Sequence, residues 1–219
     1  MIKDATMFLE EIESNFDIDS LTGEDFEEIM LTDYLSARYD YAYGASKGVM
    51  FPIGEYDEVI KLPLFYSDRY DFDHDLRLSA NYCDIEYENY IKAQEYGVAQ
   101  YFAALRFLGS VQGYSIYAQE YCEIDDEYDI SEEDSFEKAF SIYTESQSST
   151  GLPKEWAAEF IERYGESELV KLYDFIKDVG MNDLHDSNVG RRQDGSLVII
   201  DYSGFEGWFY KGYTFVKEW

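Results

Sequence analysis

The stretch "MNDLHDSNVGRRQDGSLVIIDYSGF", residues 181–205, joins an acidic polar loop to a short apolar run. Asp183 lies near the start of the loop, Asn188 follows it by five positions, and Asp201 comes directly after "LVII". The Gly-containing turn between these runs predicts a hairpin whose second strand ends at Asp201. A chain that is acidic throughout thus gathers carboxylates in one loop and places another at a strand end.

Composition predicts a globular protein with an unusual charge. The chain has 219 residues, of which 46% are hydrophobic, enough for one sizeable core or two small lobes. Its formal net charge of −30 repels nucleic-acid backbones and anionic membranes, and it attracts basic partners. Direct nucleic-acid binding by a basic surface is therefore excluded, whereas mimicry of nucleic acid and simple solubility both remain open.

The two cysteines and the apolar segments indicate a cytoplasmic protein. Cys83 and Cys122 have neither the spacing of a zinc site nor the density of a disulfide framework. No stretch approaches the roughly 18 apolar residues of a membrane span, and no export signal is recognisable. We therefore expect neither a structural zinc ion nor a membrane partner.

Hydrophobic periodicity predicts an α+β chain. Apolar residues at helical spacing predict helices over 5–16 and 23–38. A hairpin and a strand ending near Lys61 follow, then a helix over 81–107 and a strand over 113–122.

The second half of the chain is predicted to be mainly helical. Residues 123–150 form an acidic crossing with at most one helix, and helices are expected over 152–165 and 166–180. The expected organisation has three parts. These are a helical extension over 1–38, a β-rich lobe over 39–122, and the acidic crossing with the remaining helices over 123–219.

The spacing of Asp183, Asn188 and Asp201 resembles the protein-kinase signature, and "D-L-H-x-x-N" is similar to that of aminoglycoside and choline kinases. The nearest resemblance is to compact kinase-like proteins encoded by bacteriophages. It implies a two-lobed protein-kinase-like fold with a reduced helical C-lobe, and ATP and Mg²⁺ as cofactors. Asp183 would be the catalytic base, and Asn188 and Asp201 would hold the metal, because phosphoryl transfer needs hard oxygen ligands.

Upstream motifs follow in the order that this resemblance implies. Lys61 in "VIK" resembles the strand lysine that contacts the α- and β-phosphates, and Gly44 and Gly48 resemble a shortened glycine-rich loop. An ordinary hairpin turn would also explain these glycines. Lys61 should pair with a glutamate of the next helix, and we prefer Glu86 because Tyr90 then lies one turn later on the same side. The candidates are Glu86, Glu88 and Glu95.

The resemblance also implies an adenine site. The segment "AQEYC" falls where the family joins its two lobes, so the Glu120 carbonyl and the Cys122 N–H are candidate contacts to the base. Ile199 or Val198, on the strand before Asp201, would pack beneath the ring. We take Ile199 as the first candidate.

The sequence departs from the family in three places. Met181 replaces the histidine that normally braces the loop, and the segment after Asp201 reads Tyr202-Ser203-Gly204, one residue longer before its glycine. Eighteen residues follow Asp201, too few for an activation segment. We therefore do not expect regulation by activation-loop phosphorylation.

Two classes of function follow from these patterns. The first is an ATP- and Mg²⁺-dependent phosphotransferase that modifies Ser or Thr on a basic host protein, in the host cytoplasm if a phage encodes the chain. The second is a catalytically silent kinase-like module whose acidic surface captures a basic host protein as a nucleic-acid mimic or inhibitor. A small-molecule kinase is a third, lesser alternative.

Overall fold

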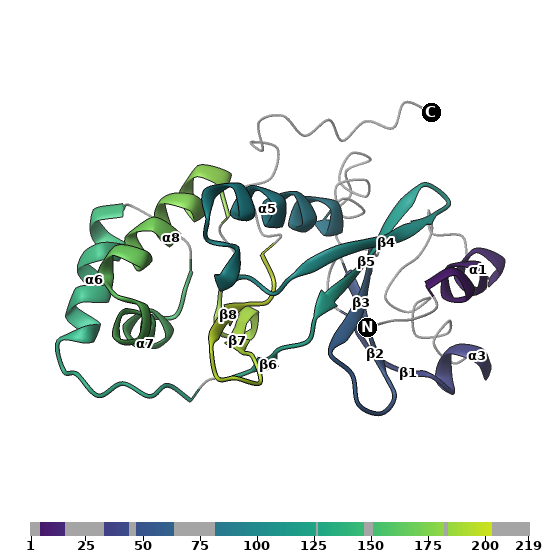
Figure 1. Ribbon diagram of the computed structural model, residues 1–219, viewed down its shortest axis with the longest axis horizontal. Coiled ribbons are helices and arrows are strands. Elements are labelled where there is room, and N and C mark those ends of the chain that lie inside the picture. Colours follow the sequence, from purple (N-terminus) through teal and green to yellow (C-terminus); the bar gives the residue numbers. More distant parts are fainter. Residues whose placement is uncertain are drawn as a thin grey trace, which may run out of the picture. The chain divides into compact units, whose positions relative to one another are not determined.

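In the computed structural model, the protein is α+β and divides into two compact units (Figure 1). Among the described residues, the first unit comprises those up to Tyr87 and Leu105–Tyr121, and the second comprises Glu88–Ala104 and those from Cys122 to Tyr202. The described residues are 5–15, 33–43, 47–63, 82–125, 127–146, 151–181 and 184–202.

The first unit is built on a five-stranded antiparallel sheet with the order β1-β2-β3-β5-β4. The chain leaves the sheet after β3, passes through helix α5 (Tyr82–Tyr96), and returns as the β4–β5 hairpin. The strands are β1 Tyr39–Tyr43, β2 Lys47–Pro52, β3 Glu58–Pro63, β4 Leu105–Val111 and β5 Tyr114–Glu120.

Helix α1 (Ala5–Asn15) shares a core with this sheet, close to the predicted helix over 5–16. Phe8 and Ile12 are buried, while Met7, an apolar residue of the same predicted helix, is 49% exposed. A short helix, α3 (Asp33–Ser36), contributes Leu35 to the same core. Most of the second predicted helix lies outside the described residues. The other members of this core are Met50, Ile60, Leu62, Val111 and Ile116.

The helix predicted over 81–107 is wrong in its second half. Helix α5 ends at Tyr96, because Gly97 adopts a positive φ of 76° that stops the helical repeat. A 3₁₀ turn, η2 (Ala99–Tyr101), follows, and then β4 pairs with β5. Short apolar runs fit a helix or a strand equally well, and pairing with β5 decides the outcome here.

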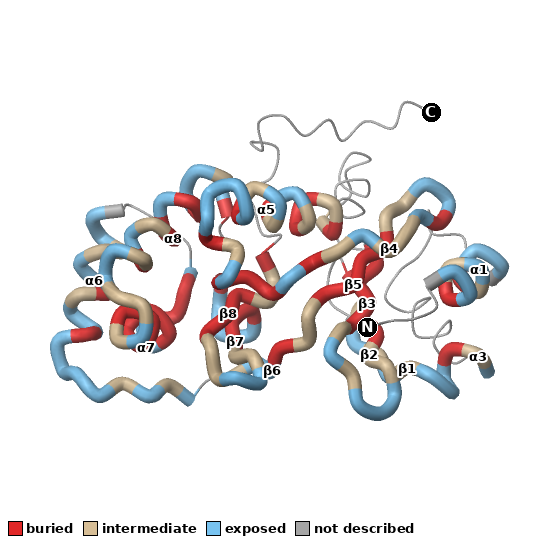
Figure 2. The backbone as a smooth tube through the Cα atoms, in the orientation of Figure 1, coloured by how far each residue is buried: buried red, intermediate tan, exposed pale blue. Residues whose placement is uncertain are grey.

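The second unit packs helices α6 (Ser135–Ser146), α7 (Lys154–Tyr164) and α8 (Glu166–Val179), the end of α5 and a small sheet around a buried core (Figure 2). Helix α6 is the one helix in the described part of the acidic crossing, for which at most one helix was predicted. Helices α7 and α8 match the predicted ranges closely, and Gly180 ends α8. The sheet has the order β6-β7-β8, with β6 Glu123–Ile124, β7 Val189–Arg191 and β8 Leu197–Ile199.

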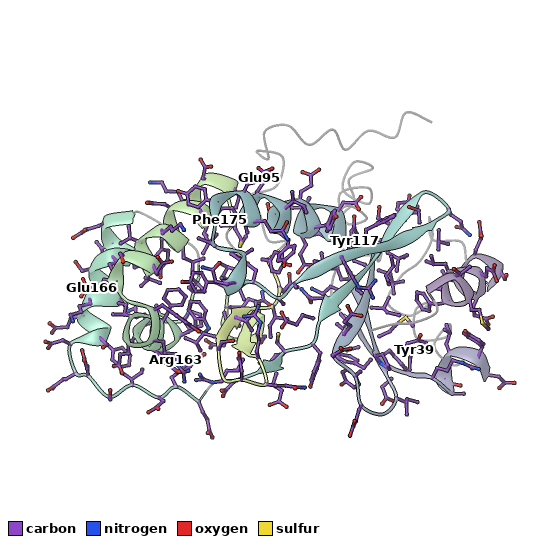
Figure 3. The ribbon with its side chains drawn as sticks, in the orientation of Figure 1. Tyr39, Glu95, Tyr117, Arg163, Glu166 and Phe175 are labelled. Carbon is purple, nitrogen blue, oxygen red and sulfur yellow. The ribbon has the colours of Figure 1, made fainter. Side chains whose placement is uncertain are left out.

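Aromatic rings fill the centre of the second unit. Trp156, Phe160 and Phe175 are buried, and Phe102 packs edge-on against Phe175 with ring centroids 5.6 Å apart. Figure 3 labels Phe175 among the side chains of α8. Such rings bury large apolar areas, so this cluster supplies most of the hydrophobic stabilisation of the unit.

Both cysteines are buried free thiols, in agreement with the absence of a predicted disulfide. Burial raises the pKa of the Cys83 thiol far above its ordinary value, which keeps the group protonated. Within the described residues, no helix has the length and apolar character needed to cross a membrane.

The position of α1 gives a stability prediction. Replacing Phe8 with Ala should lower the free energy of unfolding by about 3–5 kcal/mol, because a fully buried ring leaves a cavity against the sheet. Urea denaturation followed by circular dichroism measures the loss. The adjacent change Met7→Ala is the control, since that side chain is 49% exposed and should cost less than about 1 kcal/mol. Equal losses in the two variants would contradict the described packing of α1.

Candidate functional site

A buried ion pair joins β3 to α5 in the first unit. The Lys61 Nζ atom donates to both carboxylate oxygens of Glu86, at 2.8 and 3.0 Å. The Glu86 side chain is fully buried and that of Lys61 is 5% exposed. Gln119 Nε2 lies 3.4 Å from the same carboxylate. Charged side chains are rarely buried unless they are paired, so this contact is a specific feature of the fold.

Sheet register explains how Lys61 reaches α5. Lys61 lies opposite Tyr117 on β5 and opposite Val49 on β2, so these three residues share one face of the sheet. The Tyr117 hydroxyl, labelled in Figure 3, donates to Asp84 near the start of α5. Burial and the Asp84 carboxylate raise the pKa of Tyr117, which keeps this hydroxyl a donor. The core that contains α1 uses the opposite face.

The structure selects among the three glutamates considered as partners of Lys61. Glu86 forms the ion pair, as we preferred from the sequence. Glu88 is 51% exposed and lies 4.0 Å from Lys92, one turn along the helix. Glu95 is exposed on the same helix (Figure 3). The pairing thus follows from which face of α5 meets the sheet.

In the second unit, a hairpin brings the backbones of Asn188 and Asp201 together. Val189 pairs with Ile199, so Asn188 and Ile200 lie just beyond the last paired residues. The Asn188 carbonyl accepts the N–H groups of Ile200 at 2.7 Å and Asp201 at 3.3 Å. The backbones of the two proposed metal ligands, thirteen positions apart in the sequence, therefore meet through the β7–β8 register.

The Asn188 side chain is fixed from its own loop. It is 9% exposed, and its Nδ2 atom lies 3.2 Å from His185 Nε2. Ser187 N–H donates to the Nδ1 atom of the same histidine. The turn Asp186–Asn188, η3, thus holds the amide in one orientation. Asp183, the proposed base, lies outside the described residues.

Tyr202, directly after Asp201, is held at both ends. Its carbonyl accepts from Asn89 Nδ2 at 3.0 Å, and its hydroxyl donates to the Ala103 carbonyl at 2.7 Å. The ring is fully buried and packs edge-on against Phe102. Asp201 therefore precedes a residue that is anchored by two buried hydrogen bonds.

The proposed adenine contacts lie at the boundary of the two units along the chain. Glu120 ends β5 opposite Glu58, and Cys122 is the first residue of the second unit. Ile199 is fully buried in the aromatic core of the second unit, whereas Val198 forms a separate cluster with Cys122 and Ala103. Neighbouring strand residues face opposite sides, so of the two candidates it is Val198 that lies with Cys122, and both side chains are fully buried.

The expected glycine-rich turn lies only partly within the described residues. Gly48 lies within β2, paired with Tyr43 on one side and Leu62 on the other. Gly44 lies outside the described residues. Gly48 therefore has a strand position and does not itself form the turn.

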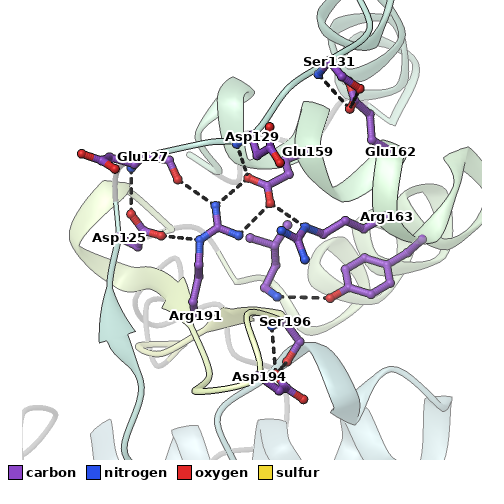
Figure 4. A network of polar contacts seen from close by, with 12 residues as sticks. Asp125, Glu127, Asp129, Ser131, Glu159, Glu162, Arg163, Arg191, Asp194 and Ser196 are labelled. Atoms are coloured by element: carbon purple, nitrogen blue, oxygen red, sulfur yellow. Dashed lines mark hydrogen bonds and ion pairs between the residues drawn. The ribbon is translucent and has the colours of Figure 1, made fainter.

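Arg191 of β7 clamps the acidic crossing onto α7 (Figure 4). Its Nη1 and Nη2 atoms lie 2.7 and 2.6 Å from the two carboxylate oxygens of Glu159. Its Nε donates to Asp125, and its Nη2 also donates to the Glu127 carbonyl. One guanidinium thus joins the hairpin after Asn188 to the crossing and to the helical core.

Glu159 is the centre of this network. It is fully buried, and it also accepts from the Asp129 N–H at 2.9 Å and from Arg163. Burial by itself would raise the pKa of Glu159, but the hydrogen bonds from Arg191, Asp129 and Arg163 outweigh burial and lower it. The carboxylate therefore stays ionised inside the unit.

Glu162, one turn later on α7, fixes the next part of the crossing. It accepts from the Ser131 N–H, the Glu132 N–H and the Ser135 hydroxyl, at 3.0, 2.9 and 2.8 Å. The backbone donors contribute most to lowering the pKa of Glu162 to about 2. A segment rich in acids is thus held by carboxylates that accept from its own N–H groups.

Sequence reasoning missed two residues, Lys47 and Arg191. Lys47 lies in "GASKGV", a stretch that was interpreted only through its glycines, as a shortened glycine-rich loop. Period-two spacing from Val49 would have placed Lys47 on the Lys61 face once the strands were aligned. Arg191 carried no signal, because its partners lie 32 and 66 positions away.

Gly190 allows β6 to approach β7. A Cβ atom at this position would lie 2.0 Å from the Glu123 carbonyl oxygen, far inside contact distance. Gly190 pairs with Ile124, so the approach is needed for the strand that follows Cys122. Glycine thus links the hairpin of Asn188 and Asp201 to the start of the crossing.

A scan against protein-family models and searches of curated proteins and of solved structures found no match to this chain.

The Arg191 clamp predicts a large stability effect. Arg191→Met should lower the free energy of unfolding by about 3 kcal/mol, because it leaves the buried Glu159 carboxylate without its two-point partner. Arg163→Met is the matched control, since this arginine is 37% exposed and forms an i,i+4 pair with the same carboxylate. It should cost about 0.5 kcal/mol in the same urea titration. Similar costs would contradict a central role for Arg191.

Glu162 predicts a pH dependence. Its pKa is lowered from 4.5 to about 2 in the folded chain, so its stabilisation is complete above pH 4.5 and is lost as the pH falls from 4.5 to about 2. Glu162→Gln should therefore make the unfolding midpoint less dependent on pH within that window. Glu95→Gln, at an exposed position on α5, is the control and should leave the slope unchanged. Identical slopes in the natural chain and Glu162→Gln would contradict the prediction.

Proposed function

We propose that this protein is an ATP- and Mg²⁺-dependent phosphotransferase with a two-lobed kinase-like fold, acting on Ser or Thr of a basic protein. The observation that carries the proposal is the buried Lys61–Glu86 ion pair between β3 and α5. Replacing a buried ion pair by apolar residues is often neutral or stabilising, so stability alone is a weak reason to keep one. A lysine held in place by a carboxylate is suited to binding phosphate oxygens.

The order of elements supports the kinase-like assignment. A β1–β2 turn precedes the Lys61 strand, α5 carries the partner glutamate, and β5 leads to Glu120 and Cys122. In the proposal, the Glu120 carbonyl and the Cys122 N–H contact adenine, and Val198 packs under the ring. Ala103, Cys122 and Val198 form a buried apolar cluster that includes one of the proposed contact residues, and apolar side chains of this kind line base-binding sites.

The second group of residues supplies donors of the right kind for Mg²⁺. Asn188 and Asp201 offer an amide oxygen and a carboxylate, and Mg²⁺ commonly takes one or two protein oxygens, with phosphates and water completing its shell. Within the described residues, no three His, Cys, Asp or Glu side chains gather into a self-sufficient metal cage. A site completed by nucleotide phosphates agrees with that donor set. When bound, the ion would neutralise charge on the phosphates.

The roles of the remaining residues follow from this assignment. Asp183, five positions before Asn188, would orient the attacking hydroxyl and accept its proton. His185 fixes the amide of Asn188, and Tyr202 fixes the backbone after Asp201. The chain's own contribution is thus to position a phosphate, a metal and a hydroxyl, which accounts for most of the catalysis in phosphoryl transfer.

The net charge supports a second candidate, a catalytically silent module that captures a basic host protein. At −30 the chain attracts cationic surfaces strongly, and the crossing presents exposed acids at Glu127, Glu132 and Glu133. Asp125 of the same segment is instead engaged by Arg191. A pure mimic would have no use for the Lys61–Glu86 pair, so we place this function second.

Calorimetric titration with ATP, in Mg²⁺ and in EDTA, together with labelled phosphate transfer to a basic test protein, tests the proposal. The natural chain should bind ATP in a Mg²⁺-dependent manner. Asp201→Asn should weaken Mg²⁺-dependent binding by about tenfold or more and abolish transfer. Asp183→Asn should keep binding but lower the transfer rate by about 10²–10⁴-fold. Asp174→Asn, at an exposed position on α8, is the matched control and should change neither.

The same variants separate the two functions. Absence of ATP binding by the natural chain at millimolar nucleotide would reject the phosphotransferase. Capture of the basic protein should then weaken when Glu127, Glu132 and Glu133 are changed to Gln, and Asp183→Asn should leave capture unchanged. Unchanged transfer by Asp201→Asn would remove this residue from the metal site.

A further inference from the structure

A second buried lysine faces the Glu86 carboxylate. Lys47 Nζ lies 3.7 Å from Glu86 Oε2, and its side chain is 8% exposed. Lys61 donates to both oxygens of that carboxylate at 2.8 and 3.0 Å. Two ammonium groups thus converge on one fully buried glutamate.

Strand register places both lysines on one face of the sheet. Val49 lies opposite Lys61, and Lys47 is two positions before Val49 on β2, so the lysines are diagonal neighbours. The alternate residues Met50 and Ile60 point into the core that contains α1. Nothing in the packing of that core therefore requires a lysine at position 47.

Lys47 interacts with Glu86 through its charge and does not form a hydrogen bond with it. Its 3.7 Å separation exceeds hydrogen-bond distance, and Lys61 already donates to both carboxylate oxygens. Asp84, the other nearby acid of α5, accepts the Tyr117 hydroxyl. Two ammonium groups that converge on one carboxylate form a locally cationic site, and such a site suits an anion that brings several oxygens of its own.

We propose that Lys47 is a second phosphate-binding residue, which acts with Lys61 to hold the polyphosphate chain of a nucleoside triphosphate. This inference rests on the proposed function and extends it, because it gives the site two cationic contacts and hence a preference for longer phosphate chains. Lys47 is the first residue of β2 and precedes Gly48 of the predicted glycine-rich stretch. Glu86 orients both ammonium groups, and Lys61 remains the residue that it holds more tightly.

Titration calorimetry with the full chain tests the role of Lys47. The probes are ATP, inorganic tripolyphosphate and adenosine, each in Mg²⁺. Lys47→Met and Lys47→Gln should weaken ATP and tripolyphosphate binding by about tenfold or more, the effect of losing one charged contact, and leave adenosine binding unchanged. Lys92→Met is the matched control, because Lys92 is 42% exposed on α5, and it should match the natural chain.

The outcomes separate this inference from the proposed function. If the natural chain binds ATP and Lys61→Met weakens that binding while both Lys47 variants keep it, the role of Lys47 is overturned and the phosphotransferase stands. If the natural chain binds neither ATP nor tripolyphosphate, both proposals fail. If adenosine binding falls together with ATP binding, Lys47 acts through the fold and not through phosphate. Thermal unfolding of each variant without ligand identifies any variant that fails to fold. If Lys47→Met fails to fold, Lys47→Gln provides the test.

Discussion

The buried Lys61–Glu86 ion pair is the interaction on which the first unit depends. Two opposite charges can be removed from water together only if their geometry is close to ideal, and here both carboxylate oxygens meet the same ammonium group. That geometry requires β3 to be in register with β2 and β5, and it requires α5 to present one particular face. The aromatic and apolar core on the other face of the sheet, with Phe8 and Ile12 of α1, supplies the hydrophobic stabilisation that this polar contact lacks.

The second unit shows how an acidic chain can use its acids as structural acceptors. Glu159 and Glu162 of α7 receive N–H donors from the crossing, and Arg191 supplies the positive charge that the composition makes scarce. Each carboxylate is stabilised in its ionised form by contacts made only after folding, so the pKa of each is lowered. The hairpin of Asn188 and Asp201 is attached to this network through β7, and its geometry thus depends on contacts far from the loop itself.

Sequence predicted the parts of the fold that depend on local pattern. Helices α7 and α8 and the choice of Glu86 follow from helical spacing, and the crossing was expected to hold at most one helix. The sequence did not predict β4, because Gly97 ends the helix before an apolar run that only pairing with β5 turns into a strand. Nor did it distinguish Val198 from Ile199, or find Lys47 and Arg191. Those depend on which face a strand presents and on partners distant in the chain, which no local pattern contains.

The anchoring of Tyr202 has a consequence for how ligands are received. Hydrogen bonds hold the chain at Asp201 and at the next residue. The Asp201 N–H donates to the Asn188 carbonyl, and Tyr202 is bonded to Asn89 and Ala103. A ligand that bound beside Asp201 would not have to order this backbone. The loss of conformational entropy that usually weakens binding to loops has already occurred during folding. Preorganisation of this kind would make the association of a ligand beside Asp201 depend mainly on desolvation of the ligand itself.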